Sequence, residues 1–189
     1  MAPRKAVQRE LTREMIMDAA RDLFIANGYR QVSMRQIAKE LAYSHGAIYY
    51  HFHNKAELFY ALVEKHFHML DQSLDRIMAR PLEPLEKLKA VMLGYIEFGL
   101  THQSHYEIMF LTKDEEVVHW MNQGPNRSYE KFAQSVFSLC EREISLQQIW
   151  CLFLALHGFV THYLRHVNGY EEVKELAHAH VVFLMGAMT

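Results

Sequence analysis

Residues 33–52 have the sequence SMRQIAKELAYSHGAIYYHF, and this stretch organises the N-terminal part of the chain. Apolar residues recur in its first half at i, i+3, i+4 and i+7, from Met34 to Leu41, which predicts a short helix with one apolar stripe. Ser33 stands directly before this stripe, where its hydroxyl can accept hydrogen bonds from the first free backbone N–H groups. The pattern therefore predicts a capped helix that begins after Ser33.

The second half of this stretch predicts another short helix. Ser44 can cap it in the same way, and Ile48 and Phe52 lie one turn apart as its inward-facing residues. Two capped helices with about three residues between them match a helix-turn-helix, in which the second helix enters the major groove of DNA. The residues alone therefore favour a DNA-binding unit.

The composition favours an all-helical protein. Of its 189 residues, 50% are hydrophobic and 12% aromatic, so the chain can bury a sizeable core and is not a disordered protein. It contains only 8 Gly and 4 Pro, and few runs of β-branched residues, which disfavours a fold built from many strands and turns. The length allows one domain or two small ones.

Charge is distributed unevenly along the chain. Residues 1–55 carry 9 Lys and Arg against 5 Asp and Glu, whereas residues 56–189 carry 11 against 17. A basic first quarter on an acidic remainder fits a segment that meets a polyanion. A small excess of basic residues is also compatible with an ordinary solvated surface.

The cysteines and the N-terminus bear on the compartment. Cys140 and Cys151 are too few for a disulfide framework, and their apolar surroundings predict two buried free thiols, which fit a reducing cytoplasm. The first residues contain no apolar run typical of a signal peptide, and no stretch reaches the length of about 18 apolar residues that a membrane helix needs. We therefore expect a cytoplasmic protein that does not bind a membrane.

Apolar periodicity and capping residues predict about nine helices and no strand. The helices expected outside residues 33–52 include residues 13–27, 55–80, 85–102, 127–143, 146–167 and 171–188. Asn168 and Gly169 are expected to end the helix over residues 146–167. The last two helices are apolar on more than one side, which suggests burial against a second copy of the chain.

A set of short motifs over residues 12–58 has a specific order and spacing. The motifs are Ile16-x-x-Ala19-Ala20-x-x-Leu23-Phe24, Gly28-Tyr29, Ser33-Met34-x-x-Ile37-Ala38, Ser44-x-Gly46-Ala47-Ile48-Tyr49-Tyr50-x-Phe52 and Asn54-Lys55-x-x-Leu58. In these motifs the chain resembles the N-terminal DNA-binding domain of the TetR-type transcriptional regulators. The resemblance covers about a quarter of the chain.

The resemblance implies a two-domain, all-α architecture. Residues 1–55 would form a three-helix helix-turn-helix DNA-binding domain, and residues 56–189 a helical ligand-binding and dimerisation domain. One departure concerns the turn, where the family usually has glycine and this chain has Ala42. If this residue has a positive φ, alanine costs about 1 kcal/mol relative to glycine.

The resemblance also implies which residues contact DNA. Tyr49, Tyr50 and Lys55 match positions that the family uses largely for the DNA backbone, and His45 could bond to a purine N7. The full set of candidate DNA-binding residues is Ser33, Arg35, Ser44, His45, Gly46, Ala47, Tyr49, Tyr50, His51 and Lys55. The recognition helix contains no Arg or Lys, so one subunit would discriminate sites only modestly. We therefore expect a homodimer, formed through residues 145–167 and 171–188.

A ligand pocket is expected among the middle helices, because bodies of this family usually hold one. Methionine and aromatic side chains adapt to varied apolar ligands, although such stripes are more often plain core. The candidate ligand-binding residues are Met92, Tyr95, Phe98, Phe110, Trp120, Phe132, Trp150, Phe153 and His157. The effector is an unknown small, mostly apolar molecule, and no cofactor is expected.

These observations predict a ligand-responsive transcriptional repressor that binds a pseudo-palindromic DNA operator as a dimer. An activator of the same fold is the first alternative. A His-rich metal-binding or enzymatic protein is the second: His162 and His166 are spaced i, i+4, and His102 and His105 are spaced i, i+3. No nucleophile elbow, phosphate loop or paired-carboxylate motif supports an enzyme.

Overall fold

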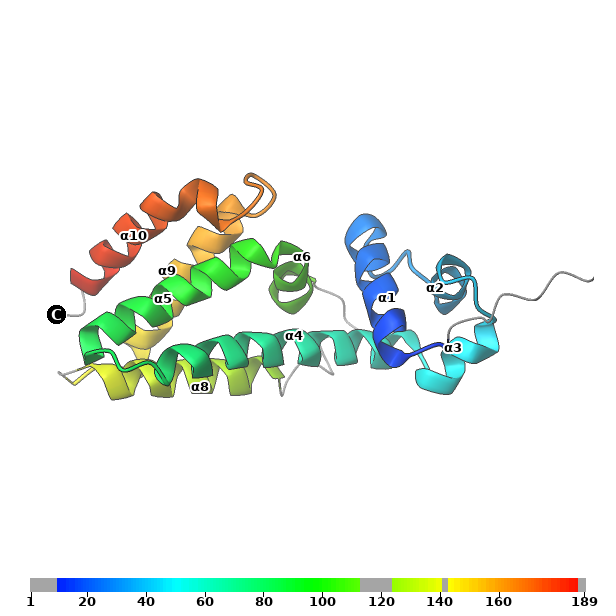
Figure 1. Cartoon of the computed structure of the whole chain (residues 1–189), viewed down its shortest axis with the longest axis horizontal. Helices are drawn as coiled ribbons and strands as arrows, with labels where there is room; N and C mark the ends of the chain where they lie inside the picture. Colours follow the sequence, from blue (N-terminus) through cyan, green and yellow to red (C-terminus); the bar gives the residue numbers. More distant parts are fainter. Residues whose placement is uncertain (1–9, 113–123, 141–142, 187–189) are drawn as a thin grey trace, which may run out of the picture.

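The computed structural model describes residues 10–112, 124–140 and 143–186, and within these residues all regular structure is helical, as predicted. Figure 1 shows a small N-terminal group of helices joined by one long helix to a larger body. The elements are α1 (Arg13–Asn27), α2 (Met34–Glu40), α3 (His45–His51), α4 (Lys55–Met78), α5 (Pro84–Thr101), α6 (Gln103–Tyr106), the π-helical turn η1 (Glu107–Leu111), α8 (Gly124–Leu139), α9 (Leu146–Tyr163), the 3-10 turn η2 (Tyr170–Val173) and α10 (Lys174–Gly186).

The predicted helix caps of the N-terminal helices are confirmed. The hydroxyl of Thr12 accepts a hydrogen bond from the backbone N–H at the start of α1. Ser33 forms a reciprocal capping box with Gln36 at α2, and the Ser44 hydroxyl accepts from the Ala47 N–H at α3. Each cap satisfies backbone donors that the first turn of a helix leaves without an intrahelical partner.

The turn between α2 and α3 contains a residue in the left-handed conformation. Ala42 has φ 57°, so the condition under which alanine costs about 1 kcal/mol relative to glycine is met at this position. Its N–H donates to the carbonyl of Lys39 (3.1 Å), and the next N–H, of Tyr43, donates to the carbonyl of Ala38 (3.0 Å). These two bonds end α2 and set the direction in which α3 begins.

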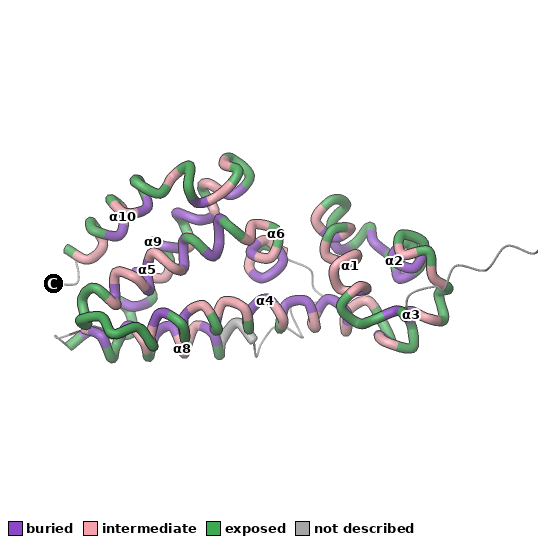
Figure 2. Tube along the Cα trace, in the orientation of Figure 1, coloured by how far each residue is buried: buried purple, intermediate pink, exposed green. Residues whose placement is uncertain are grey.

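Helix α4 links the two parts of the molecule (Figures 1 and 2). Its 24 residues span about 36 Å, and Asn54 caps it by accepting from the Glu57 N–H at 2.7 Å. In its first half, buried residues such as Phe59 belong to the core of the N-terminal helices. In its second half, buried residues such as Leu74 belong to the core of the body. One helix therefore takes part in both hydrophobic cores.

Helix α5 lies at the centre of the body, where it packs against α4, α8, α9 and α10. Gly99 allows α5 and α9 to approach closely, because a Cβ at this position would lie 2.6 Å from a methyl group of Val160. The same Cβ would lie 3.1 Å from the ring of Tyr106. A larger residue at position 99 would therefore push two packed elements away from α5.

The predicted end of the long C-terminal helix is wrong. Helix α9 ends at Tyr163 and not at Val167, and Arg165 follows with φ 63°. The Arg165 guanidinium donates to both carboxylate oxygens of Glu107 at 2.5 and 2.7 Å, and its backbone N–H donates to the side-chain oxygen of Gln103 at 2.9 Å. These contacts with a distant segment turn the chain away from the helix four residues early.

Other boundaries and one burial prediction also need correction. Helix α8 runs over Gly124–Leu139 and not 127–143, and α10 begins at Lys174, after a 3-10 turn, and not at Glu171. Cys140 is half-buried and Cys151 is exposed, so the expectation of two buried thiols is wrong. Cys151 is exposed because the apolar helix α9 has one side that the described part of the chain leaves uncovered, where Trp150 and Leu154 are also exposed.

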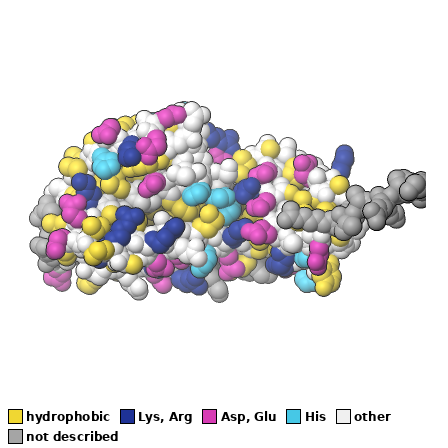
Figure 3. All heavy atoms as spheres, viewed as in Figure 1, with side chains coloured by type: hydrophobic (Ala, Val, Ile, Leu, Met, Phe, Trp, Pro, Cys, Tyr) yellow, Lys and Arg dark blue, Asp and Glu magenta, His cyan; other side chains and the backbone are white. Residues whose placement is uncertain are grey.

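Histidines gather where the body meets the N-terminal helices (Figure 3). The ring of His105 on α6 stacks on that of His66 from α4, with centroids 4.1 Å apart, and on that of His102 at 5.3 Å. Arg21 of α1 places a guanidinium nitrogen 3.4 Å from His105 Nε2. Burial, and secondarily the nearby cationic groups, lower the pKa of His66 to about 3 and that of His105 to about 4.

A helix that crosses a bilayer needs about 20 predominantly apolar residues. Within the described residues, no helix combines the necessary length with a sufficiently apolar sequence.

Replacing Ala42 by glycine is expected to raise the free energy of unfolding by about 1 kcal/mol, because glycine adopts a positive φ without steric cost. Urea unfolding followed by circular dichroism measures the change. Ala61→Gly, inside α4, is the matched control and is expected to lower the stability by about 1 kcal/mol or more. A stability of Ala42→Gly at or below that of the parent chain would contradict the strained turn.

The buried imidazole of His66 should make the protein less stable in acid. Between pH 6.5 and the folded pKa of about 3, the unfolded chain binds a proton at this residue and the folded chain does not, so stability falls as pH falls. Between pH 7.5 and 5 the decrease due to His66 is about 2 kcal/mol.

Urea unfolding at several pH values, at one protein concentration, tests this expectation with His66→Phe. The variant retains a ring that can stack on His105 but cannot titrate, so its stability should depend less steeply on pH. His53→Phe, at an exposed position, should keep the parent slope. Equal slopes for His66→Phe and the parent chain would show that this imidazole does not stay neutral.

Candidate functional site

Helix α3 exposes the side chains that the sequence predicts for DNA contact. Ile48 is the residue of α3 that is fully buried, and Phe52 is its buried C-cap. Of the two residues that follow Ile48, Tyr49 is 39% exposed and Tyr50 is 85% exposed. The ring of His45 meets that of Tyr49 edge-on with centroids 4.5 Å apart. Two aromatic residues of a short helix are therefore directed outwards and contribute little to the core.

Gly46, near the start of α3, has no structural requirement within the chain. A Cβ added here would meet no atom within 4 Å, and its φ is not in the left-handed region. A glycine inside a helix lowers stability by about 1 kcal/mol relative to alanine. The small size of this exposed residue fits a surface that another molecule approaches closely.

Arg13 of α1 binds the C-terminal end of α3, and it is not among the residues predicted from the sequence. Its guanidinium donates a hydrogen bond to the backbone carbonyl of His51 and lies over the ring of Phe52, 3.9 Å from the centroid. A cation at a helix C-terminus satisfies a free carbonyl and interacts favourably with the helix dipole. The contact joins residues 38 positions apart, so no local pattern indicates it.

Lys55, at the start of α4, is held in a defined position beside α3. Its ammonium group donates to the carbonyl of Tyr29 at 2.9 Å and lies 4.1 Å from the centroid of the same residue's ring. An ammonium group has three donors, so this contact leaves capacity for a phosphate oxygen. The side chain is thus ordered before any DNA binds.

The other predicted DNA-binding residues lie on the same part of the molecule. Arg35 is exposed on α2, and the hydroxyls of Ser33 and Ser44 are engaged in their helix caps. His51 is half-buried, and Ala47 is half-buried in the first turn of α3. All ten predicted residues therefore fall on the start of α2, its first turn, α3 with its cap, and the first residue of α4.

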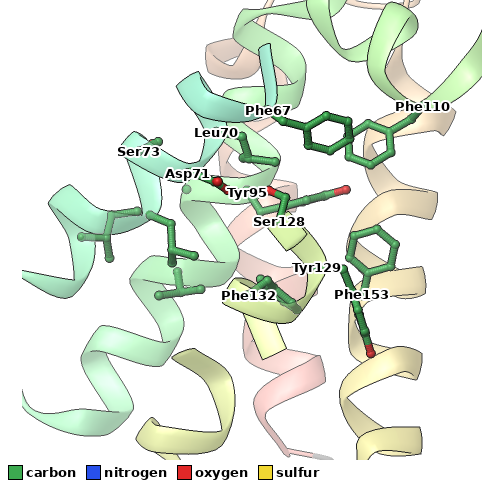
Figure 4. A pocket seen from close by; sticks show the side chains of 14 residues that line it. Phe67, Leu70, Asp71, Ser73, Tyr95, Phe110, Ser128, Tyr129, Phe132 and Phe153 are labelled. Carbon is green, nitrogen blue, oxygen red and sulfur yellow. Dashed lines mark hydrogen bonds between the residues drawn. The ribbon is translucent and has the colours of Figure 1, made fainter. Parts of the chain in front are cut away.

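A cavity lies in the body between α4, α5, α8 and α9 (Figure 4). Its free volume is about 40 Å³. The free volume holds one or a few water molecules, so a larger ligand must displace side chains. The aromatic residues at this cavity are Phe67, Tyr95, Phe110, Tyr129, Phe132 and Phe153.

Four of the nine predicted ligand-binding residues line this cavity: Tyr95, Phe110, Phe132 and Phe153. Met92 and Phe98 do not line it. Met92 is buried in the core of the body, and Phe98 is buried with the N-terminal helices and lines a separate pocket between α4, α5 and α10. Trp150 lies on the surface and stacks on Phe153 with centroids 5.3 Å apart. Trp120 lies outside the described residues.

His157 does not line the cavity but takes part in a buried polar chain that reaches it. Its Nδ1 is 2.5 Å from the hydroxyl of Tyr106, which in turn is 2.9 Å from the hydroxyl of Tyr95. Burial lowers the pKa of His157 and raises those of both tyrosines. The three side chains therefore remain neutral near pH 7, and Tyr95 connects them to the cavity.

The cavity also contains a carboxylate that the sequence analysis missed. Asp71 of α4 is 6% exposed, and one of its carboxylate oxygens accepts a hydrogen bond from the hydroxyl of Ser128 on α8 at 2.5 Å. An apolar helix face with one Asp is the only sequence signal, and it does not show which helix covers that face. Among the described residues, no three His, Cys, Asp or Glu side chains converge to hold a metal ion.

The N-terminal helices match a known protein family. Residues 16–62 match the family model described as "Bacterial regulatory proteins, tetR family". The HTH-type transcriptional regulator UidR of Escherichia coli is 38% identical over 95 residues, which cover 49% of this chain and 44% of UidR. The HTH-type transcriptional activator FasR of Mycolicibacterium smegmatis is 23% identical over 139 residues, 74% of this chain and 63% of FasR. The matched part of this chain spans between a third and a half of the length of the first relatives.

The whole fold also has close counterparts among solved structures. The transcriptional regulator FadR of Bacillus subtilis, solved in complex with stearoyl-CoA, superposes with a TM-score of 0.75 at 20% identity. The superposition covers 92% of this chain and 97% of FadR, so the likeness extends from the N-terminal helices through the body. Residues 16–62 therefore match the DNA-binding domain of the tetR family of bacterial regulatory proteins, and the chain as a whole shares the fold of FadR.

Proposed function

We propose that the protein is a ligand-responsive transcriptional regulator that binds a pseudo-palindromic DNA operator as a homodimer. In this proposal residues 1–55 bind DNA, and residues 56–189 bind the ligand and form the dimer. The observation that carries the proposal is α3: a short helix whose outer side is exposed while Ile48 and Phe52 anchor its inner side. Its curated relatives are regulators, and this function requires no catalysis.

DNA contact would use the exposed side of α3 and the two helix starts beside it. The hydroxyls of Tyr49 and Tyr50 and the ammonium of Lys55 suit phosphate oxygens, and His45 and Ala47 suit base edges. Arg35 supplies a guanidinium from α2, where it could reach a guanine. With few base contacts in each subunit, discrimination would require two subunits on two half-sites.

Dimerisation would use the outer side of the last two long helices. Leu146, Trp150 and Leu154 of α9 are exposed at four-residue intervals, which places them on one face of that helix. On α10, Leu176 and Phe183 are exposed two turns apart. Contiguous exposed apolar side chains of this kind mark association surfaces, and a second copy of the chain offers the matching surface.

The segment 103–111 would couple the ligand to the DNA-binding helices. Phe110 lines the cavity, and its ring contacts that of Phe67 with centroids 5.3 Å apart. The same segment carries His105, which stacks on His66 and lies beside Arg21 of α1. A ligand that displaces Phe110 would therefore shift α6 against α1, and so change the separation of the paired α3 helices. Such control requires that the ligand bind one of the two arrangements more tightly than the other.

Repression is the direction that we propose. If the separation of the two α3 helices in the ligand-free dimer matches the operator, a ligand that changes this separation releases the DNA. FasR is named as an activator, so the same fold also serves activation, and FadR of Bacillus subtilis was solved with stearoyl-CoA, so a body of this fold can hold a ligand. A cytoplasmic location is part of the proposal, because the operator is there.

The double variant Tyr49→Phe with Lys55→Ala is expected to weaken operator binding at least about tenfold, because it removes two phosphate-binding groups from each subunit. The salt dependence of the affinity should also become shallower, by about one unit of slope for each Lys55 charge that the variant lacks, because the neutral hydroxyl of Tyr49 displaces no counterion. Gel-shift titrations at several salt concentrations measure both effects, on fragments that the parent protein selects from the host genome.

Lys87→Ala on α5 is the control for the removal of a positive charge, and it should leave the affinity unchanged. Circular dichroism verifies that the double variant is folded, since Lys55 also contacts Tyr29. Unchanged operator affinity of the folded double variant would refute the assigned role of α3 and the start of α4.

Phe183→Asp is expected to convert a dimer into a monomer, because the side chain is 77% exposed in one chain and would become buried between two. Sedimentation velocity at micromolar concentration measures the change. Phe137→Asp on α8, also exposed but outside α9 and α10, is the matched control and should leave the dimer intact. A monomeric parent protein, or a dimeric Phe183→Asp variant, would exclude this interface.

A further inference from the structure

We propose that the body cavity selects an organic cation, with an ammonium-type group beside Asp71 and an aromatic or aliphatic remainder among the surrounding rings. This inference rests on the proposed ligand-binding role of the body and specifies the chemical class of the ligand. It follows from the position of the Asp71 carboxylate, from the rings around it and from the pairing of Lys131 with Asp75 rather than with Asp71.

Asp71 brings a carboxylate into a largely apolar cavity. The residue is 6% exposed, and its neighbours in the cavity wall include Leu70, Leu74 and Phe67. Figure 4 shows the carboxylate directed towards Ser128, whose hydroxyl donates to it at 2.5 Å. A hydroxyl satisfies one lone pair but supplies no positive charge, and a buried carboxylate is stabilised far more by a cation.

Lys131 of α8 lies near Asp71, but its charge is directed elsewhere. Its ammonium lies 2.7 Å from the carboxylate of Asp75, one turn further along α4, at the outer edge of the helix pair. Its contact with Asp71 is a 3.4 Å hydrogen bond to the backbone carbonyl. Among the described residues, the carboxylate of Asp71 thus has a hydroxyl partner and forms no salt bridge with a lysine or arginine.

The rings around this carboxylate suit a cation. Figure 4 shows Phe67 and Phe110 at one end of the cavity and Tyr129, Phe132 and Phe153 at the other. Tyr129 and Phe153 meet edge-on with ring centroids 5.5 Å apart, and Phe67 and Phe110 do so at 5.3 Å, so these four rings form two packed pairs in the cavity wall. Ring faces attract cations, and a carboxylate at the same place adds to this attraction.

The same carboxylate would disfavour an anionic ligand. A fatty acid or an acyl-CoA would bring a second negative charge into a site with a low dielectric, where like charges repel strongly. FadR of Bacillus subtilis has the same fold and was solved with stearoyl-CoA. The two bodies would therefore share an architecture and differ in the charge of the ligand that they accept.

A matched pair of small probes tests the sign of the charge. Benzyltrimethylammonium and phenylmethanesulfonate have the same benzyl group and opposite charges, and both are small enough for a cavity that must open to admit a ligand. Isothermal titration calorimetry with the full-length protein at constant ionic strength measures both affinities. We expect the cation to bind at least about tenfold more tightly than the anion.

The variant Asp71→Asn tests whether this carboxylate causes the preference for the cationic probe. The amide oxygen can still accept from Ser128, so the link between α4 and α8 persists while the charge is removed. We expect the affinity for benzyltrimethylammonium to fall at least about tenfold. Asp75→Asn, on the same helix but paired with Lys131 outside the cavity, should change it less than about twofold. Should Asp71→Asn fail to fold, Tyr129→Leu removes a ring of the cavity and should also weaken binding of the cation.

Each outcome decides the inference. Equal affinities for the two probes, tighter binding of the anion, or full binding of the cation by Asp71→Asn would overturn it, and Asp71 would then be only a structural link to Ser128. Gel shifts with the parent protein are measured separately. A protein that binds its operator but not the cation would refute this inference and leave the proposed function intact. A protein that binds the cation but no genomic DNA would refute the proposed function.

Discussion

The arrangement of the whole molecule depends on α4, a single uninterrupted helix whose buried side is divided between two hydrophobic cores. Phe59, Val63 and Phe67 are buried with the N-terminal helices, whereas Leu74 and Ile77 are buried with the body. Because a helix transmits displacement as a stiff rod of about 36 Å, neither core can repack at α4 without moving residues of the other. The helix therefore makes the position of α3 a property of the entire chain and not of the N-terminal helices alone.

The sequence predicted those features that depend on neighbouring residues. Ser33 and Ser44 cap their helices as expected, and Ile48 and Phe52 are fully buried. Each of these predictions needs only a few adjacent side chains, because caps and turns satisfy local backbone groups. The roles of individual residues in binding DNA and ligand, and the boundary between residues 55 and 56, stay predictions.

The features that the sequence did not predict join residues far apart in the chain. The end of α9 depends on Glu107, 58 residues before Arg165, and the end of α3 is capped by Arg13, 38 residues before His51. The same holds for the cavity, where Asp71 meets Ser128 across 57 residues. Periodicity indicated that Phe98 and Met92 are buried, but it could not show that neither of them lines the cavity that Tyr95 of the same helix lines.

Phe67 and Phe110 belong to the wall of the cavity and also pack in the core of the N-terminal helices. In evolutionary terms, ligand preference and operator geometry are therefore not independent traits in this chain. A substitution that enlarges the cavity at either ring also loosens the packing beneath α1, because both effects arise from the same side chain. Variation confined to the α8 and α9 side of the cavity, at Tyr129, Phe132 or Phe153, avoids that conflict. New ligand specificities should arise most readily there.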